Sequence, residues 1–194
     1  MRATAAADPP MKNACSIASV RARRACGVDA AIIGALPVDK SRLGIHAHDD
    51  TGQAVANSLA AVRAGVRQVQ GTLNGIGERC GNANLVTLIP TLLLKPVFSD
   101  ALEIGVSPGQ LSEITRVSRA FDDLLNRAAD RQAPYVGASA FATKAGIHAS
   151  ALAKDPSTYE HVPPERVGNE RNIMVSQQAG KSNLLTALKR NGIK

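Results

Sequence analysis

Hydrophobic and polar positions first become regular near residue 43, where a two-residue period is followed by a helical one. The segment LGIHAH (43–48) is typical of a short strand that ends in a polar turn. The next segment, QAVANSLAAVRAG (53–65), is predicted to be a helix that stops at Gly65, a natural helix terminator. Its apolar residues recur at helical spacing: Val55, Leu59 and Val62.

The same two periods then repeat. The segment VRQVQGTLNG (66–75) alternates as a second strand, and a glycine-rich loop leads to a second predicted helix at about 83–94. Two consecutive strand–helix units with short connections predict an α/β fold with a parallel sheet.

The pattern changes after Pro96. Residues 107–129 are predicted to form one amphipathic helix, and SNLLTALKRNG (182–192) a closing helix. Residues 1–35 are rich in alanine and arginine and show no sustained period. The chain is therefore predicted to divide into an atypical segment (1–35), an α/β part (36–96) and a mostly helical part (97–194). The long helix carries its apolar stripe on Leu111, Ile114, Val117, Phe121, Leu124 and Leu125.

Composition narrows the possible partners. Apolar residues make up 44% of the chain and aromatic residues only 3%, so the core rests on Ala, Val, Leu and Ile. The formal charge of +7 suits anionic small molecules or nucleic acid. However, the dense basic run is limited to RARR (21–24), and few aromatic side chains are available to stack on bases. We therefore expect no specific nucleic-acid partner.

Cysteine usage and hydropathy favour a cytoplasmic protein. The three cysteines show no CxxC spacing, so a reducing compartment is expected rather than a disulfide framework. The N-terminus lacks the hydrophobic region of a secretory signal. The most apolar run (85–98) is interrupted by Pro90 and Lys95, so no membrane span is expected.

Two histidines and two aspartates follow the first predicted strand. His46 and His48 are two residues apart in a strand, so both imidazoles should project from the same face. Two imidazoles with Asp49 and Asp50 beside them suit a divalent metal ion at the carboxyl end of a parallel strand. The same spacing fits two solvated histidines at a turn, and it leaves both interpretations open.

The loop NGIGERCGN (74–82) follows the second predicted strand. It is not a dinucleotide fingerprint, because Cys80 occupies the position of the third glycine. The later AGKSN segment is not a phosphate-binding loop, because its first glycine position is Val175. Cys80 is expected to be a packed small residue. The polar residues of the loop are either mouth residues of a barrel or loop caps: Asn74, Glu78, Arg79 and Asn82.

A later segment, KAGIHASALAKDPSTYEH (144–161), contains His148, Tyr159 and His161. Histidine and tyrosine in loops can act as acid/base groups. Exposed polar side chains without a catalytic role are the commoner alternative.

Taken together, these segments resemble the isopropylmalate, homocitrate and citramalate synthases over roughly residues 35–194. The motifs that carry the resemblance are HxH[DN]D, here beginning at His46, and NGxGERxGN at a fixed distance from it (74–82). The segment KDPSTYEHVPPERVGN (154–169) is most similar to the citramalate synthase branch, with the isopropylmalate synthases second. The resemblance implies the last two βα units of a (β/α)8 TIM barrel, followed by a mostly helical linker subdomain.

The resemblance also implies roles for individual residues. His46 and His48 would bind a divalent ion (Mg²⁺, Mn²⁺ or Zn²⁺), with Asn82 completing or supporting the site. His148 and Tyr159 would reach the active site of a partner subunit in a homodimer and handle acetyl-CoA there. The barrel mouth would be shaped by Gly75, Gly77, Glu78 and Arg79.

The implied reaction is an acyl transfer in branched-chain amino-acid biosynthesis. Acetyl-CoA would be condensed with pyruvate to give citramalate, towards isoleucine, or with 2-oxoisovalerate to give isopropylmalate, towards leucine. Family members also have an Arg-Asp-Gly segment on the first barrel strand and, in many cases, a regulatory domain, and this sequence matches neither. Thr143 stands where many members have histidine. We therefore expect a C-terminal portion that lacks activity alone, or alternatively a non-catalytic, self-associating fragment.

Overall fold

The computed structural model of the chain describes residues 33, 35–143, 146–173 and 188. Most of the atypical segment 1–35 and of the predicted closing helix therefore lies outside the described residues. The chain forms two compact units, Met1–Thr91 and Leu92–Lys194. The domain limits expected from the sequence, at 35 and 96, stay predictions.

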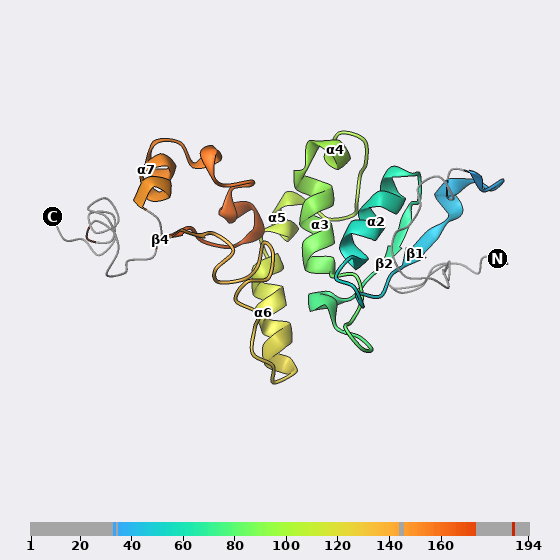
Figure 1. The fold of residues 1–194 in the computed structure, drawn as a ribbon, viewed down its shortest axis with the longest axis horizontal. Helices are drawn as coiled ribbons and strands as arrows, with labels where there is room; N and C mark the ends of the chain where they lie inside the picture. The colour runs from blue at the N-terminus through green and yellow to red at the C-terminus, as the bar shows by residue number, and fades with distance from the viewer. Residues whose placement is uncertain (1–32, 34, 144–145, 174–187, 189–194) are drawn as a thin grey trace. The chain divides into compact units, whose positions relative to one another are not determined.

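The first unit is built on two short parallel strands. Strand β1 (Gly44–His46) pairs with β2 (Gln68–Gln70), with Ile45 opposite Val69. Helix α2 (Ala54–Arg63) connects the strands and packs against both (Figure 1). Helix α3 (Leu85–Leu94) follows β2, so the predicted order of strand, helix, strand and helix is confirmed, as is the parallel pairing. The described part of this unit also contains two 3-10 turns: η1 (Lys40–Arg42) and η2 (Leu73–Gly75).

Local chemistry explains where α2 begins and ends. The carboxylate of Asp49 accepts a hydrogen bond of 2.8 Å from the backbone N–H of Ala54, and so satisfies one of the unpaired donors of the first turn. Gly65 has a φ of 111°, in a region that favours glycine, and the chain leaves the helix there as the sequence predicts. The helix buries Ala54, Ser58, Ala61 and Val62.

The second unit differs from the expected single long helix. Two helices are present instead, α5 (Pro108–Leu111) and α6 (Ile114–Leu124). They are interrupted where the backbone of Gly168 lies against the carbonyl of Ser112, so closely that a Cβ at Gly168 would be 1.9 Å from that oxygen. The prediction of one helix over 107–129 is therefore wrong.

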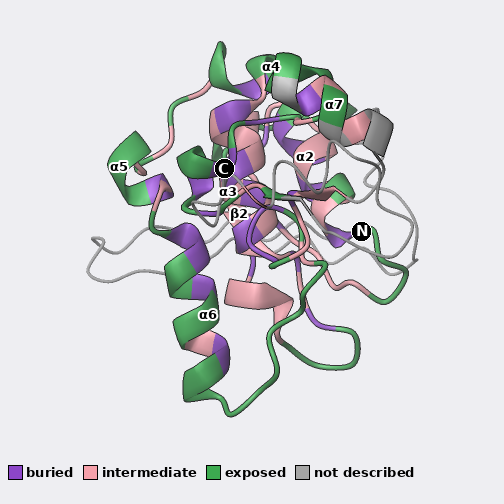
Figure 2. Ribbon diagram, turned by 90° about the vertical axis from the view of Figure 1, so that its left-hand side faces the viewer, coloured by how far each residue is buried: buried purple, intermediate pink, exposed green. Residues whose placement is uncertain are grey.

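The predicted apolar stripe of that helix is only partly buried. Val117, Leu124 and Leu125 are exposed, whereas the buried positions of α6 are Ile114, Thr115, Ser118 and Asp122 (Figure 2). A polar residue is tolerated on the buried side because the hydroxyl of Thr115 donates a hydrogen bond of 2.6 Å to the carbonyl of Val167.

The rest of the second unit, as far as it is described, consists of short elements. A buried Asn169 joins two of its loops, since its side-chain amide donates to the carbonyls of Tyr135 at 2.8 Å and Gly137 at 3.0 Å. None of the helices in the described ranges has the length and apolar character needed to cross a membrane. The remaining elements are α4 (Pro96–Ser99), β3 (Ala142–Thr143), α7 (Gly146–Lys154), η3 (Pro156–Thr158), η4 (Pro164–Val167) and β4 (Asn172–Ile173), with β3 and β4 parallel.

Gly168→Ala should destabilise the second unit. Gly168 has a φ of 66°, and a non-glycine residue in this conformation costs about 1 to 3 kcal/mol before the clash with Ser112 is added. Both tyrosines lie in this unit and the chain has no tryptophan, so urea unfolding followed by tyrosine fluorescence reports on it alone. Gly105→Ala is the matched control, because nothing lies within 4 Å of an added Cβ there. Equal unfolding midpoints for the two variants would contradict the close approach of Gly168 to Ser112.

Candidate functional site

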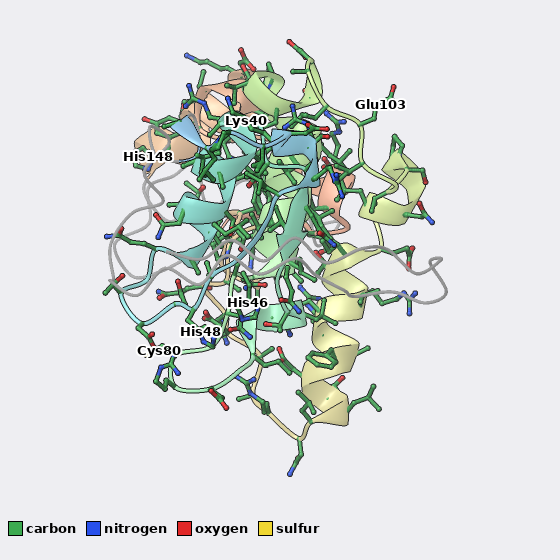
Figure 3. All side chains as sticks on the ribbon, turned by 90° about the vertical axis from the view of Figure 1, so that its right-hand side faces the viewer. Lys40, His46, His48, Cys80, Glu103 and His148 are labelled. Carbon is green, nitrogen blue, oxygen red and sulfur yellow. The ribbon has the colours of Figure 1, made fainter. Side chains whose placement is uncertain are left out.

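His46 and His48 meet at the carboxyl end of β1. Their Nε2 atoms are 3.3 Å apart and their ring centroids 5.0 Å apart, in an edge-to-face arrangement. The prediction that both imidazoles lie on one side of the strand is thereby confirmed (Figure 3). The backbone of His48 pairs with that of Asn82, which brings the loop after β2 beside the two rings.

Three polar atoms at this place are buried without a hydrogen-bond partner among the described residues. They are Nδ1 of His46, Nδ1 of His48 and Oδ1 of Asn82. Buried polar atoms are nearly always paired in folded proteins, because an unpaired one loses its bonds to water without replacement. Three such atoms in one place make the end of β1 the candidate site of the first unit.

The carboxylates of the two aspartates have hydrogen-bond partners other than the imidazoles. Besides accepting from Ala54, Asp49 donates its backbone N–H to the carbonyl of Gly81 at 2.9 Å. Asp50 accepts two hydrogen bonds from the guanidinium of Arg79, at 2.8 and 3.0 Å. Among the described residues, no group of three His, Cys, Asp or Glu side chains is placed to hold a metal ion.

The loop 74–82 is folded around the side chain of Asn82. Its amide donates to the carbonyl of Ile76 at 3.4 Å, and a Cβ at Gly77 would lie 2.6 Å from that amide nitrogen. A Cβ at Gly81 would lie 1.9 Å from the carbonyl oxygen of Gly75, so the loop can close only with glycine there. Gly75 itself has a φ of 67°.

The tip of this loop is open to solvent. Glu78 is exposed, with its carboxylate 3.7 Å from the guanidinium of Arg79. Cys80 is exposed as well, so the prediction of a packed cysteine is wrong. The ion pair between Arg79 and Asp50 fixes the tip to the turn after β1, which leaves Cys80 on the outer side of the loop.

The ion pair sets the titration of Asp50. Hydrogen bonds from Arg79 favour the charged carboxylate and lower the pKa of Asp50, with further contributions from the charges of Arg79 and His48. In turn, Asp50 raises the pKa of Arg79. Because the pKa of Asp50 is lowered on folding, its contribution to stability is present above its unfolded pKa and is lost as the pH falls through the folded value.

His148 and Tyr159 form a second pair, within the second unit. His148 lies on α7 and Tyr159 follows η3, and their ring centroids are 4.3 Å apart with a tilt of 36°. Tyr159 is 52% exposed, so the pair is open to solvent. The structure thus brings together the two residues to which the family resemblance assigned a shared role.

His161, the third residue of that segment, has a partner that sequence analysis missed. The ammonium of Lys95 lies 3.0 Å from its Nδ1 and donates to its carbonyl oxygen at 3.0 Å. The two residues are 66 positions apart, and no local signal in either segment links them.

Two family descriptions match the chain. An HMGL-like domain matches residues 28–119, and a homocitrate synthase post-HMGL domain matches residues 135–194. The first contains His46, His48 and the loop 74–82, and the second contains His148 and Tyr159.

Curated relatives are similar over most of the chain. The (R)-citramalate synthases of Synechocystis sp. and Aquifex aeolicus are 57% and 53% identical over 152 and 154 residues, or 78% and 79% of the chain. The 2-isopropylmalate synthase of Methylacidiphilum infernorum is 42% identical over 153 residues, again 78% of the chain. These alignments cover 27%, 28% and 30% of the relatives, so the chain spans less than a third of their length.

Arg79→Met should return the pKa of Asp50 towards its ordinary value. The substitution removes both hydrogen bonds and the positive charge that lower it. A ¹³C NMR titration of the side-chain carboxylates would show Asp50 titrating at higher pH. Asp39 is the internal control, because its pKa is lowered by Ser41 and should not move. An unchanged titration of Asp50 would contradict the pairing.

Proposed function

This chain belongs to the HMGL-like family of the citramalate and 2-isopropylmalate synthases, and on that premise we propose that it forms one part of an acetyl-CoA-dependent citramalate synthase. The citramalate synthases are acyltransferases, and the HMGL-like domain is a TIM-barrel domain. We propose that β1, α2, β2 and α3 are its last two βα units and that the second unit is the linker subdomain. The observation that carries the proposal is the placement of His46 and His48 with Asn82 at the end of β1.

The residues at the end of β1 fit a divalent ion such as Mg²⁺, Mn²⁺ or Zn²⁺. Two imidazole nitrogens that bind one such ion at about 2.1 Å lie roughly 3.0 to 3.4 Å apart. The Nε2 atoms of His46 and His48 are 3.3 Å apart, and the unpaired Oδ1 of Asn82 offers an oxygen beside them. When bound, the ion would polarise the keto group of a 2-oxo acid. Further ligands would come from outside the described residues.

The pair His148 and Tyr159 is suited to the acetyl-CoA half of the reaction. In the proposed reaction, a base removes a proton from the acetyl methyl group, and the resulting carbanion forms a C–C bond to the keto carbon, whose oxygen takes a proton. Water then cleaves the thioester, which releases CoA and the new carboxylate. An imidazole and a phenol whose ring centroids are 4.3 Å apart can hold and pass a proton at this place.

Pyruvate is the proposed acceptor, because the relatives with 57% and 53% identity are citramalate synthases. 2-Oxoisovalerate is the alternative, since a 2-isopropylmalate synthase is 42% identical. The glycines of the loop 74–82, with Glu78 and Arg79, would shape the mouth of the site. We further propose a homodimeric, cytoplasmic synthase of branched-chain amino-acid biosynthesis, with small-molecule substrates and no nucleic-acid partner.

Metal binding is expected to depend on the two imidazoles. In isothermal titration calorimetry with Mn²⁺ or Zn²⁺, His46→Ala and His48→Ala should each weaken binding by at least about tenfold. Asn82→Ala should weaken it as well. Asp39→Asn, which removes an exposed carboxylate of the same unit, is the matched control and should leave the Kd unchanged. Equal affinities in all four variants would assign the binding to another part of the chain.

Catalytic competence is best tested in a chimera, because the chain spans 27% of the Synechocystis relative. Residues of this chain would replace the matching segment of that synthase, and release of free CoA thiol from acetyl-CoA and pyruvate would be followed. We expect turnover by the chimera and none by the isolated chain. In the chimera, His148→Ala and Tyr159→Phe should lower kcat by about 10²- to 10⁴-fold.

The control substitution is Glu103→Gln, at an exposed residue outside both pairs, which should keep the activity of the chimera. A folded chimera without activity would overturn the proposal and favour the alternative, a non-catalytic fragment that associates with itself. Full activity of the chimera with Tyr159→Phe would show that Tyr159 is not a catalytic residue.

A further inference from the structure

The ammonium group of Lys95 contacts both the ring and the backbone of His161. Lys95 precedes α4, and its Nζ is 3.0 Å from the Nδ1 of His161 and 3.0 Å from the carbonyl oxygen of the same residue. One cation therefore fixes both the ring and the backbone of His161. This double contact restrains the chain more than a single side-chain hydrogen bond would. A rotation of the backbone at His161 would break the contact with Lys95, so the contact opposes such a rotation.

The ring of His161 also rests on two aromatic side chains. It is stacked on Phe141 with centroids 6.0 Å apart and 5° between the planes, and it meets Tyr135 edge-on at 5.1 Å. Tyr135 and Phe141 are buried, and the carbonyl of Tyr135 is fixed by Asn169. The surface beneath His161 is therefore part of the packed interior of this unit.

Tyr159, two residues earlier, lies on the outside. Its side chain is 52% exposed, so few neighbours restrict it. Its backbone is restrained instead. On the N-terminal side, its N–H donates to the carbonyl of Pro156 at 3.2 Å. On the C-terminal side, the carboxylate of Glu160 forms a two-point ion pair with Arg171, one contact being 2.6 Å.

We propose that Lys95 and His161 form a clamp that positions Tyr159 against the ring of His148. The clamp residues are positioning residues, since they act through the backbone of the segment 159–161. The functional meaning of the clamp rests on the function proposed above for His148 and Tyr159. An exposed tyrosine needs such a device because misplacement by about 1 Å can cost a catalyst 10²-fold in rate.

The clamp requires a neutral His161. Lys95 can donate only to an unprotonated Nδ1, and protonation would place two cations 3.0 Å apart. Burial of part of the ring lowers the pKa of His161, and the charge of Lys95 lowers it further. Among the described residues, the phenol of Tyr135 faces the ring, and the carboxylate of the neighbouring Glu160 is paired with Arg171. Acid should therefore open the clamp and destabilise this unit as the pH falls below about 6.5.

The decisive variants are His161→Asn and His161→Leu. The side-chain oxygen of asparagine can replace Nδ1 as the acceptor for Lys95, whereas leucine cannot. The readout is the ¹H–¹³C NMR signal of the His148 ring in the full chain, which the ring of Tyr159 shifts at 4.3 Å. The chain has four histidines, so this signal can be assigned by single substitutions. Tyr159→Leu gives the value expected when the contact is lost.

We expect His161→Leu and Lys95→Met to move the His148 signal to the Tyr159→Leu value, and His161→Asn to keep it. Acid should destabilise this unit in urea unfolding of the parent chain more than in that of His161→Asn, because asparagine does not titrate. An unchanged His148 signal in a folded His161→Leu or Lys95→Met chain would overturn the clamp.

The clamp and the proposed function can fail separately. In the chimera, His161→Leu should lower kcat by about 10- to 100-fold, and His161→Asn should restore it. If the NMR shifts behave as expected but Tyr159→Phe keeps full activity, the clamp is supported and the catalytic role of Tyr159 is wrong. If Tyr159→Phe is inactive and His161→Leu changes neither the shift nor kcat, the clamp is wrong and the function stands.

Discussion

Parallel pairing of β1 with β2 sends the chain to the same edge of the sheet after each strand. The turn that carries His48 and the loop that carries Asn82 leave the sheet there, and they are joined by a backbone bridge between these two residues. A second bridge joins Thr72 to Asn84, so the loop is held at both ends. The placement of these side chains therefore depends on backbone hydrogen bonds. The imidazoles of His46 and His48 lie near the amide of Asn82, although more than thirty residues separate Asn82 from the two histidines along the chain.

Much of the first unit could be predicted because its signals are local. The strand and helix periods around Ile45 and Val62, and the glycine at position 65, are each read within a few residues. The second unit could not be predicted in this way. The apolar stripe from Leu111 to Leu125 suggested which side of a helix would be buried. Burial also depends on which other segments of the chain pack against that helix. The hydroxyl of Thr115 finds its acceptor at Val167, and that partner lies 52 residues away.

The candidate site also contains both features that local sequence predicts and features that depend on distant residues. The spacing of His46 and His48 was sufficient to predict that their rings share a face, because strand geometry alone decides it. The partners of Asp49 and Asp50 were not predictable, since one caps a helix and the other pairs with an arginine 29 residues away. The link between His148 and Tyr159 came from resemblance to a family. Lys95 was missed because nothing around it in the sequence points to His161.

The two pairs are held by different physical means, and this difference has a consequence for their response to acid. The backbone positions of His46 and His48 rest on ladder hydrogen bonds, which contain no titratable group. The contact between His148 and Tyr159 rests, in our proposal, on an ammonium and a neutral imidazole, which do titrate. Mild acid should therefore disturb the contact between His148 and Tyr159, while the strand pairing that places the backbone of His46 and His48 stays in place. If Tyr159 has the role proposed above, its exposure gives it access to a large substrate, and its position depends on a side-chain contact that a single proton can break.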